Sequence, residues 1–141
     1  MKVILNIIFY IYFIPNCFGE TNTLYVERKI NINAPLEQVW LVVIDFSGVV
    51  KWLKPYMNSS KSILGKNGEP GNIRELVRKN GSKVEEKLLE VGIFDKYIKY
   101  TYSGGLPLTS DYFSEILLEE LNENSTKVIW KASFKRLHYW T

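Results

Sequence analysis

The stretch TLYVERKINI-NAP-LEQVWLVVI, residues 23–44, changes from a strand-like to a helix-like apolar period across one short turn. Its first ten residues alternate between apolar and polar side chains, as in a strand with one buried face. Asn33-Ala34-Pro35 then fits a helix start, because proline is favoured at the first helical position. The helix expected over residues 36–44 would bury one face, formed by Leu36, Val39, Trp40 and Val43.

The sequence after residue 44 predicts a second short helix followed by a run of antiparallel strands. The helix is expected over residues 49–53, just before Pro55. Turns rich in Gly, Asn and Pro separate the expected strands, which span residues 60–65, 72–78, 83–91, 97–102, 109–121 and 126–134. This spacing is typical of a sheet that curls. We therefore predict an α+β fold, with a curved antiparallel sheet of about seven strands and two short helices after the first strand.

Alternation along the strands defines an inner face of unusual composition. Its expected members are Val84, Glu86, Leu88, Ile98, Tyr100, Tyr102, Ser110, Tyr112, Ser114, Ile116, Leu118, Val128, Trp130, Ala132 and Phe134. A buried carboxylate without a partner costs several kcal/mol or stays protonated. The hydroxyls and Glu86 therefore either line a ligand cavity or are satisfied internally. In the second case Glu86 pairs with Arg74 or Arg28, and the tyrosine hydroxyls reach the rim.

The N-terminus has the pattern of an export signal. A positive start, Met1-Lys2, precedes the apolar run VILNIIFYIYFIP at residues 3–15, which is too short to span a membrane. With cleavage after Gly19, we expect residues 1–19 to be a signal peptide and residues 20–141 to be one exported domain without a stable membrane span. The alternatives are an uncleaved anchor, a buried strand, or a lipid anchor on Cys17. Cys17 is the only cysteine, so no internal disulfide is expected.

The order of these segments resembles the START-like (SRPBCC) superfamily, most closely its polyketide cyclase/dehydrase and lipid-transport branch. The resemblance covers roughly residues 25 to 135. It rests on residues 32–35, Val39-Trp40, Asp45-Phe46, Trp52, residues 71–74 and 86–90, Tyr100, Tyr102, Leu106-Pro107, Tyr112 and residues 128–130. It implies a helix-grip fold, in which the sheet grips a long C-terminal helix around an apolar cavity. That helix should begin near Lys135, so we expect it to be truncated, with a partner chain or an N-terminal helix as a substitute cover.

The resemblance implies binding of lipids, sterols, hormones or polyketides. Distant relatives among plant hormone receptors would place their cavity glutamate, tyrosine and serine on Glu86, Tyr112 and Ser114. With the inner-face pattern, this gives the candidate ligand-binding residues Arg74, Glu86, Leu88, Tyr100, Tyr102, Tyr112, Ser114 and Trp130.

Other chemistry finds little support in the sequence. The only histidine, His138, lies in the tail, and no acidic, His and Cys residues cluster as metal ligands require. The net charge of +3 is too small to predict nucleic-acid binding. We expect no metal and no cofactor. Binding or transport of an apolar, lipid-like or polyketide-like molecule is the favoured function.

Two alternatives remain open at this point. In the first, a desolvated Glu86 with a raised pKa is the catalytic group of a cofactor-free cyclase or dehydratase. In the second, the chain is a truncated, non-functional remnant or half of a complex.

Overall fold

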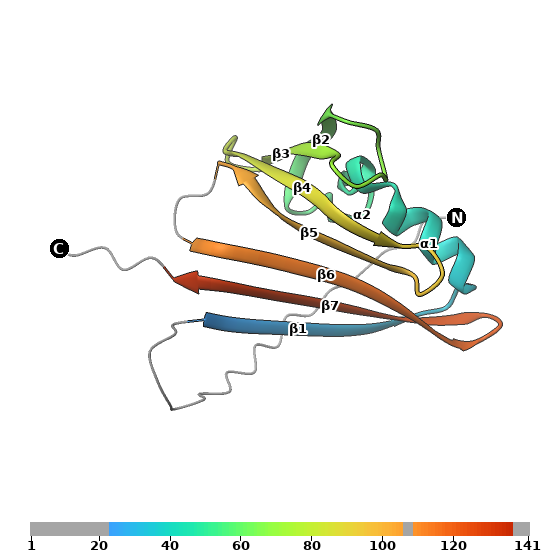
Figure 1. The fold of residues 1–141 in the computed structure, drawn as a ribbon. Coiled ribbons are helices and arrows are strands. Elements are labelled where there is room, and N and C mark those ends of the chain that lie inside the picture. Colours follow the sequence, from blue (N-terminus) through green and yellow to red (C-terminus); the bar gives the residue numbers. More distant parts are fainter. Residues whose placement is uncertain (1–22, 106–108, 137–141) are drawn as a thin grey trace.

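The computed structural model describes residues 23–105 and 109–136, which form an α+β fold (Figure 1). The elements are β1 (Thr23–Ile32), α1 (Leu36–Ile44), the 3-10 helix η1 (Phe46–Gly48), α2 (Val50–Leu53), β2 (Met57–Leu64), β3 (Ile73–Arg78), β4 (Lys83–Gly92), β5 (Tyr97–Gly104), β6 (Thr109–Asn122) and β7 (Ser125–Arg136). The prediction of a strand, two short helices and an antiparallel meander is confirmed. The observed strand ends differ from the predicted ones by at most a few residues.

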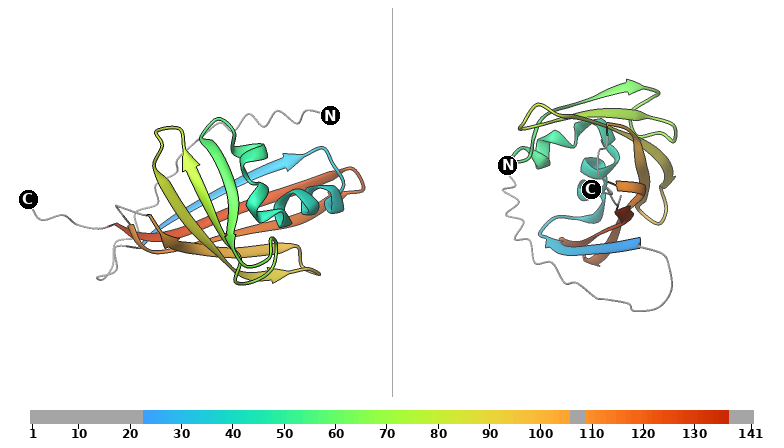
Figure 2. Two further views of the ribbon diagram at one scale, coloured as in Figure 1. Left: turned by 90° about the horizontal axis from the view of Figure 1, so that it is seen from above. Right: turned by 90° about the vertical axis from the view of Figure 1, so that its left-hand side faces the viewer.

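The seven strands form one antiparallel sheet in the order β1-β7-β6-β5-β4-β3-β2, which leaves β1 and β2 as its edges. Seen along the strands, the sheet curls into an arc, and the helices lie in the open side of that arc (Figure 2). Arg136 ends both β7 and the described residues, so the prediction about a C-terminal helix lies outside them. The predicted signal segment and Cys17 lie outside the described residues. Among residues 23–105 and 109–136, no helix is long and apolar enough to cross a membrane.

The helices close one part of the concave face and leave another part uncovered. The predicted apolar face of α1 is buried, with Val39, Trp40 and Val43 each less than 9% exposed. It packs on β6 and β7, as the pattern of residues 36–44 requires. A second apolar cluster lies under α2 and contains Val49, Leu53, Leu76 and Val84. The two clusters meet at Trp52 and Trp130, which pack against both.

A β-bulge in β6 corrects one prediction for the inner face. Asp111 has a φ of 51°, and the pairing of β6 with β7 shifts between Ser110 and Phe113. Ser110 consequently lies opposite Lys135, whereas Ser114 lies opposite Ala132 on the inner side. The prediction that Ser110 faces inward is wrong, because a bulge adds one residue and reverses the alternation on one side of it.

Candidate functional site

The centre of the concave face holds a buried ion pair. Arg74 on β3 and Glu86 on β4 lie directly opposite each other. Glu86 Oε2 accepts hydrogen bonds from Arg74 Nε at 2.7 Å and forms an ion pair with Arg74 Nη2 at 2.5 Å. The two side chains are only 5% and 7% exposed. Of the partners considered for Glu86, the structure thus places Arg74 beside it.

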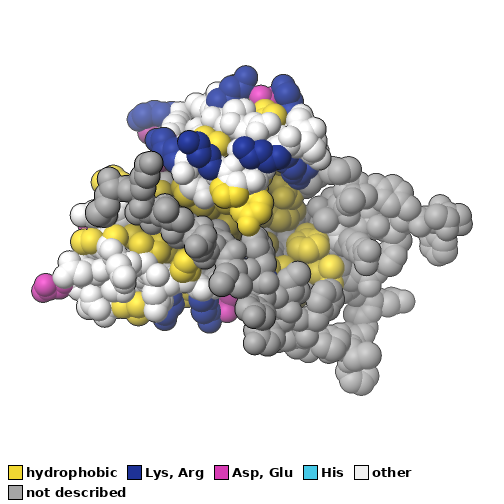
Figure 3. Space-filling model, turned by 180° about the vertical axis from the view of Figure 1, so that it is seen from behind, with side chains coloured by type: hydrophobic (Ala, Val, Ile, Leu, Met, Phe, Trp, Pro, Cys, Tyr) yellow, Lys and Arg dark blue, Asp and Glu magenta, His cyan; other side chains and the backbone are white. Residues whose placement is uncertain are grey.

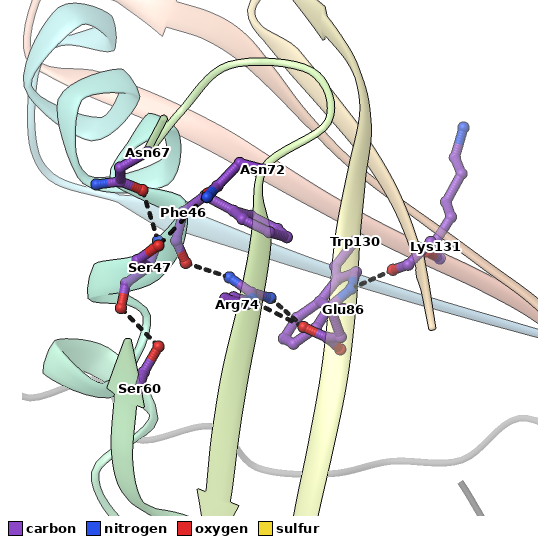
Figure 4. A network of polar contacts seen from close by, with 10 residues as sticks. Phe46, Ser47, Ser60, Asn67, Asn72, Arg74, Glu86, Trp130 and Lys131 are labelled. Atoms are coloured by element: carbon purple, nitrogen blue, oxygen red, sulfur yellow. Dashed lines mark hydrogen bonds and ion pairs between the residues drawn. The ribbon is translucent and has the colours of Figure 1, made fainter. Parts of the chain in front are cut away.

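The guanidinium of Arg74 is held on several sides (Figure 4). Its Nη1 donates to the backbone oxygen of Phe46 at 2.5 Å. Its Cζ lies 3.8 Å from the centre of the Phe46 ring and 5.2 Å from that of Tyr100. A planar guanidinium can make such hydrogen bonds and ring contacts together, which the compact ammonium of lysine cannot. The ion pair is therefore built into the core by η1 as well as by the sheet.

Three tyrosines surround this pair. Tyr102 lies opposite Glu86 and Tyr100 lies opposite Leu88, by the pairing of β4 with β5. Tyr112 follows the β6 bulge, and its ring lies against that of Tyr102, with 3.8 Å between the ring centres. Burial is the main cause that raises the pKa of each of the three hydroxyls above its ordinary value of 10.0. All three remain protonated at neutral pH and can donate hydrogen bonds.

Ser114 and Trp130 form a second polar contact on this face. Ser114 is fully buried, and its Oγ donates to the backbone oxygen of Lys131 at 2.9 Å. Ser114 Oγ in turn accepts a hydrogen bond from Trp130 Nε1 at 2.8 Å. The single hydroxyl proton of Ser114 is therefore already used. Ser114 orients the Trp130 ring, whose neighbour Trp52 packs against it edge-on, with 5.8 Å between ring centres.

Among the residues that the structure describes, Trp52 has a buried polar atom without a hydrogen-bond partner. Its Nε1 is buried and makes no hydrogen bond, and its ring packs against both apolar clusters. A buried N–H without an acceptor costs about 1–3 kcal/mol. In the sequence, Trp52 stood only among the residues that carry the family resemblance, and its unpaired N–H was not predicted.

Besides the buried polar residues Arg74, Glu86 and Ser114, the predicted site residues divide into two groups. Leu88 and Tyr100 are 0% and 1% exposed and belong to the packed core. Tyr102, Tyr112 and Trp130 are only partly buried. From behind, hydrophobic side chains gather in a recess between the upper elements and the lower strands (Figure 3). The partly buried aromatic residues are the members of the predicted set with surface available for a ligand.

A buried polar network behind the ion pair was not predicted. Asn72 is 0% exposed, and its Nδ2 donates to Ser62 Oγ at 2.6 Å and to Leu64 O at 2.8 Å. Ser47 Oγ is 3.4 Å from Asn72 Oδ1, which links η1 to β2 and β3. The Gly71-Asn72 turn before a strand was the only sequence signal. Residues 23–105 and 109–136 hold no cluster of His, Cys, Asp or Glu suited to a metal ion.

The three tyrosines predict a loss of stability at high pH. Below pH 10 the three tyrosines are protonated in both the folded and the unfolded chain, so their contribution to the free energy of unfolding is fully present there. Above it the unfolded chain loses protons that the folded chain keeps, so stability falls by about 1 kcal/mol per pH unit for each tyrosine. Urea unfolding between about pH 9 and 11 measures this slope. Tyr102→Phe should make it shallower, whereas Tyr25→Phe, on an exposed side chain, should not.

A curved open sheet, two short helices after the first strand and a buried charged pair on the concave face define a helix-grip protein of the α+β class. The family model described as polyketide cyclase / dehydrase and lipid transport matches residues 23–140. The chain belongs to this family, whose members include cyclases, dehydrases and lipid-transport proteins. No curated protein sequence matches the chain.

Solved structures agree on the fold. The protein XoxI from Bacillus cereus is 26% identical, with a TM-score of 0.70 over 82% of this chain and 78% of that one. Major latex-like protein 151 from Panax ginseng is 12% identical, with a TM-score of 0.73 over 84% and 83%. The ZhuI aromatase/cyclase from Streptomyces sp. R1128 is 16% identical, with a TM-score of 0.71 over 84% and 71%. The last two likenesses concern the fold alone.

Proposed function

We propose that the chain binds an apolar small molecule, lipid-like or polyketide-like, on the concave face of its sheet. The observation that carries this proposal is the aromatic surface that the partly buried rings of Tyr102, Tyr112 and Trp130 leave exposed on the concave face. The protonated hydroxyls of Tyr102 and Tyr112 add two hydrogen-bond donors on the same face. A small-molecule site is usually an apolar surface that carries a few polar groups. The ligand would carry at least one hydrogen-bond-accepting oxygen.

Binding is favoured over catalysis by the state of Glu86. Its Oε2 receives both contacts from Arg74, and the side chain is 7% exposed, so the carboxylate is already charge-compensated. A cyclase or dehydratase would need this carboxylate to move a proton to or from the substrate. The alternative is supported by the family description and by the name of the Streptomyces enzyme. Turnover of a polyketide substrate that disappears in Glu86→Gln, with ligand binding kept, would establish it.

Native mass spectrometry on protein purified from cells tests the binding proposal first. We expect a monomer with a discrete extra mass that is lost on denaturation. A dimer without added mass would instead indicate that a second chain covers the sheet. Empty monomer that also fails to bind Nile red, an apolar fluorophore with a carbonyl oxygen, would rule the proposal out.

Matched tyrosine variants place the bound molecule on the sheet. Tyr112→Ala should weaken Nile red binding about tenfold, because a buried aromatic contact contributes about 1.5–3 kcal/mol. Tyr25→Ala is the control, since Tyr25 is 77% exposed on β1 and outside the predicted inner set. Equal affinities in the two variants would place the probe somewhere other than the concave face.

We also propose that the chain is exported. The support is the positive start and the apolar run of residues 3–15, with a small residue at Gly19. The intact mass of the protein recovered from its host distinguishes the cases. A chain that begins at Glu20 supports cleavage after Gly19, a lipid mass on Cys17 supports the anchored alternative, and a chain that begins at Met1 contradicts both.

A further inference from the structure

Charge is divided unevenly along this chain. Residues 49–83, which include α2, β2 and β3, contain eight Lys and Arg residues and two acidic ones. The other described residues contain nine basic and twelve acidic ones. We call the surface of α2, β2 and β3 the basic edge, because β2 is also an edge strand of the sheet. The molecule is therefore electrically polarised, although its net charge is only +3.

Part of this positive charge is not neutralised locally, although Arg74, Lys51 and Lys66 pair with Glu86, Asp45 and Glu69. Glu75 is shared by two lysines, at 3.5 Å from Lys61 and 3.3 Å from Lys83. Lys54 and Lys79 form no ion pair with the part of the chain that the structure describes, and both are exposed. The backbone N–H of Lys79 donates to the backbone oxygen of Tyr56 at 3.2 Å. Since Tyr56 is two residues from Lys54, Lys54 and Lys79 lie at the same end of the basic edge.

Large apolar side chains stand exposed along the same edge: Tyr56 lies at the end with Lys54 and Lys79, and Ile63 and Leu64 lie at the other end of β2, beyond Lys61. Tyr56 is 44% exposed, Ile63 43% and Leu64 61%. Lysines on an edge strand are expected as protection against edge-to-edge pairing. That purpose does not account for apolar side chains at the same edge, which would favour association. Basic and apolar residues together on one surface are typical of a protein that lies on a lipid bilayer.

The basic edge also borders the recess of the concave face. Lys and Arg side chains surround the upper part of the molecule, directly above the hydrophobic side chains of the recess (Figure 3). A bilayer that contacted this rim would lie beside the hydrophobic side chains of the recess. Nucleic acid would be attracted by the positive charge, but its phosphates would not explain the exposed Leu64 and Ile63 side chains.

We propose that the basic edge docks on a lipid bilayer whose surface carries anionic headgroups, so that apolar ligand passes between bilayer and recess. The transfer rests on the proposed function, whereas the docking stands on charge and exposure alone. Lys54, Lys79 and the neighbouring lysines attract the headgroups. Ile63, Leu64 and Tyr56 enter the interface.

Co-sedimentation of the full chain with vesicles tests this surface. Vesicles of phosphatidylcholine with phosphatidylglycerol should bind the chain, and vesicles of phosphatidylcholine alone should bind at least about tenfold less. About 0.5 M NaCl should release most of the bound chain, because charges at a surface are screened at that concentration. Equal binding to the two vesicle types, or to neither, overturns the proposal.

A matched pair of double variants assigns the surface. Lys54→Glu with Lys79→Glu should weaken binding to the anionic vesicles about tenfold or more. Lys87→Glu with Lys131→Glu changes the net charge equally, on exposed lysines outside the basic edge, and should change binding less than about threefold. Leu64→Ser should weaken binding without altering charge. Circular dichroism verifies that each variant is folded.

Two further outcomes separate the alternatives. Equal losses in the two double variants would show attraction by net charge only and would overturn the proposal. Binding to a DNA oligonucleotide that persists when vesicle binding is absent would also overturn it, in favour of a nucleic-acid surface. Nile red binding in solution should be unchanged in Lys54→Glu with Lys79→Glu. Loss of docking alone therefore leaves the proposed ligand site standing.

Discussion

Replacing Arg74 with leucine should lower the free energy of unfolding by about 3–5 kcal/mol, which is a large part of the 5–15 kcal/mol typical of a domain. The substitution removes the partner of Glu86 while the carboxylate stays 7% exposed. It also leaves the backbone oxygen of Phe46 without its 2.5 Å donor. Urea unfolding followed by circular dichroism measures the change.

The cause of that loss can be separated from simple loss of a long side chain. Arg78→Leu makes the same substitution four residues further along β3. The Arg78 side chain donates to Ser82 Oγ at 3.3 Å, and its loss should cost less than about 1 kcal/mol. The double variant Arg74→Met with Glu86→Leu should recover most of the stability, because an apolar pair needs no charge compensation. A double variant as unstable as Arg74→Leu would contradict this account.

The sequence predicted the architecture well because each element has its own local pattern. Residues 36–44 showed a helical apolar face, and α1 has those bounds. Thr23–Ile32 alternated, and β1 has those bounds as well. Strand alternation also predicted the inward position of Glu86, because the pairing of β3 with β4 runs without a shift from Ile73–Lys87 to Val77–Lys83.

What local pattern could not predict was contact between distant segments. The bulge at Asp111 has no glycine to mark it, so the position of Ser110 was predicted wrongly. The partner of Glu86 was left between Arg74 and Arg28, because side-chain pairing depends on strand order as well as on alternation. The ring and carbonyl of Phe46 beside Arg74 depend on how η1 packs on β3, which no periodicity encodes.

Phe46→Ala should destabilise the fold by about 3–5 kcal/mol, the usual cost of removing a buried aromatic ring. Phe46 is 1% exposed, and its ring meets both the guanidinium of Arg74 and the edge of Tyr100, at 5.7 Å between ring centres. The cavity would lie beside a buried ion pair, so water could reach Glu86. Phe94→Ala is the control, since Phe94 is 97% exposed and should change stability by less than about 0.5 kcal/mol.

A third variant distinguishes ring electrostatics from volume. Phe46→Leu keeps most of the apolar bulk but removes the aromatic face over Arg74, so it should cost about 1–2 kcal/mol. The backbone oxygen of residue 46 can accept the hydrogen bond from Arg74 in both Phe46 variants, so this hydrogen bond does not contribute to the difference between them. Urea unfolding of the three variants under one condition gives the order. If Phe46→Leu is as destabilised as Phe46→Ala, the ring face and not the filled volume holds Arg74 against Glu86. If it is as stable as the parent chain, packing alone does so.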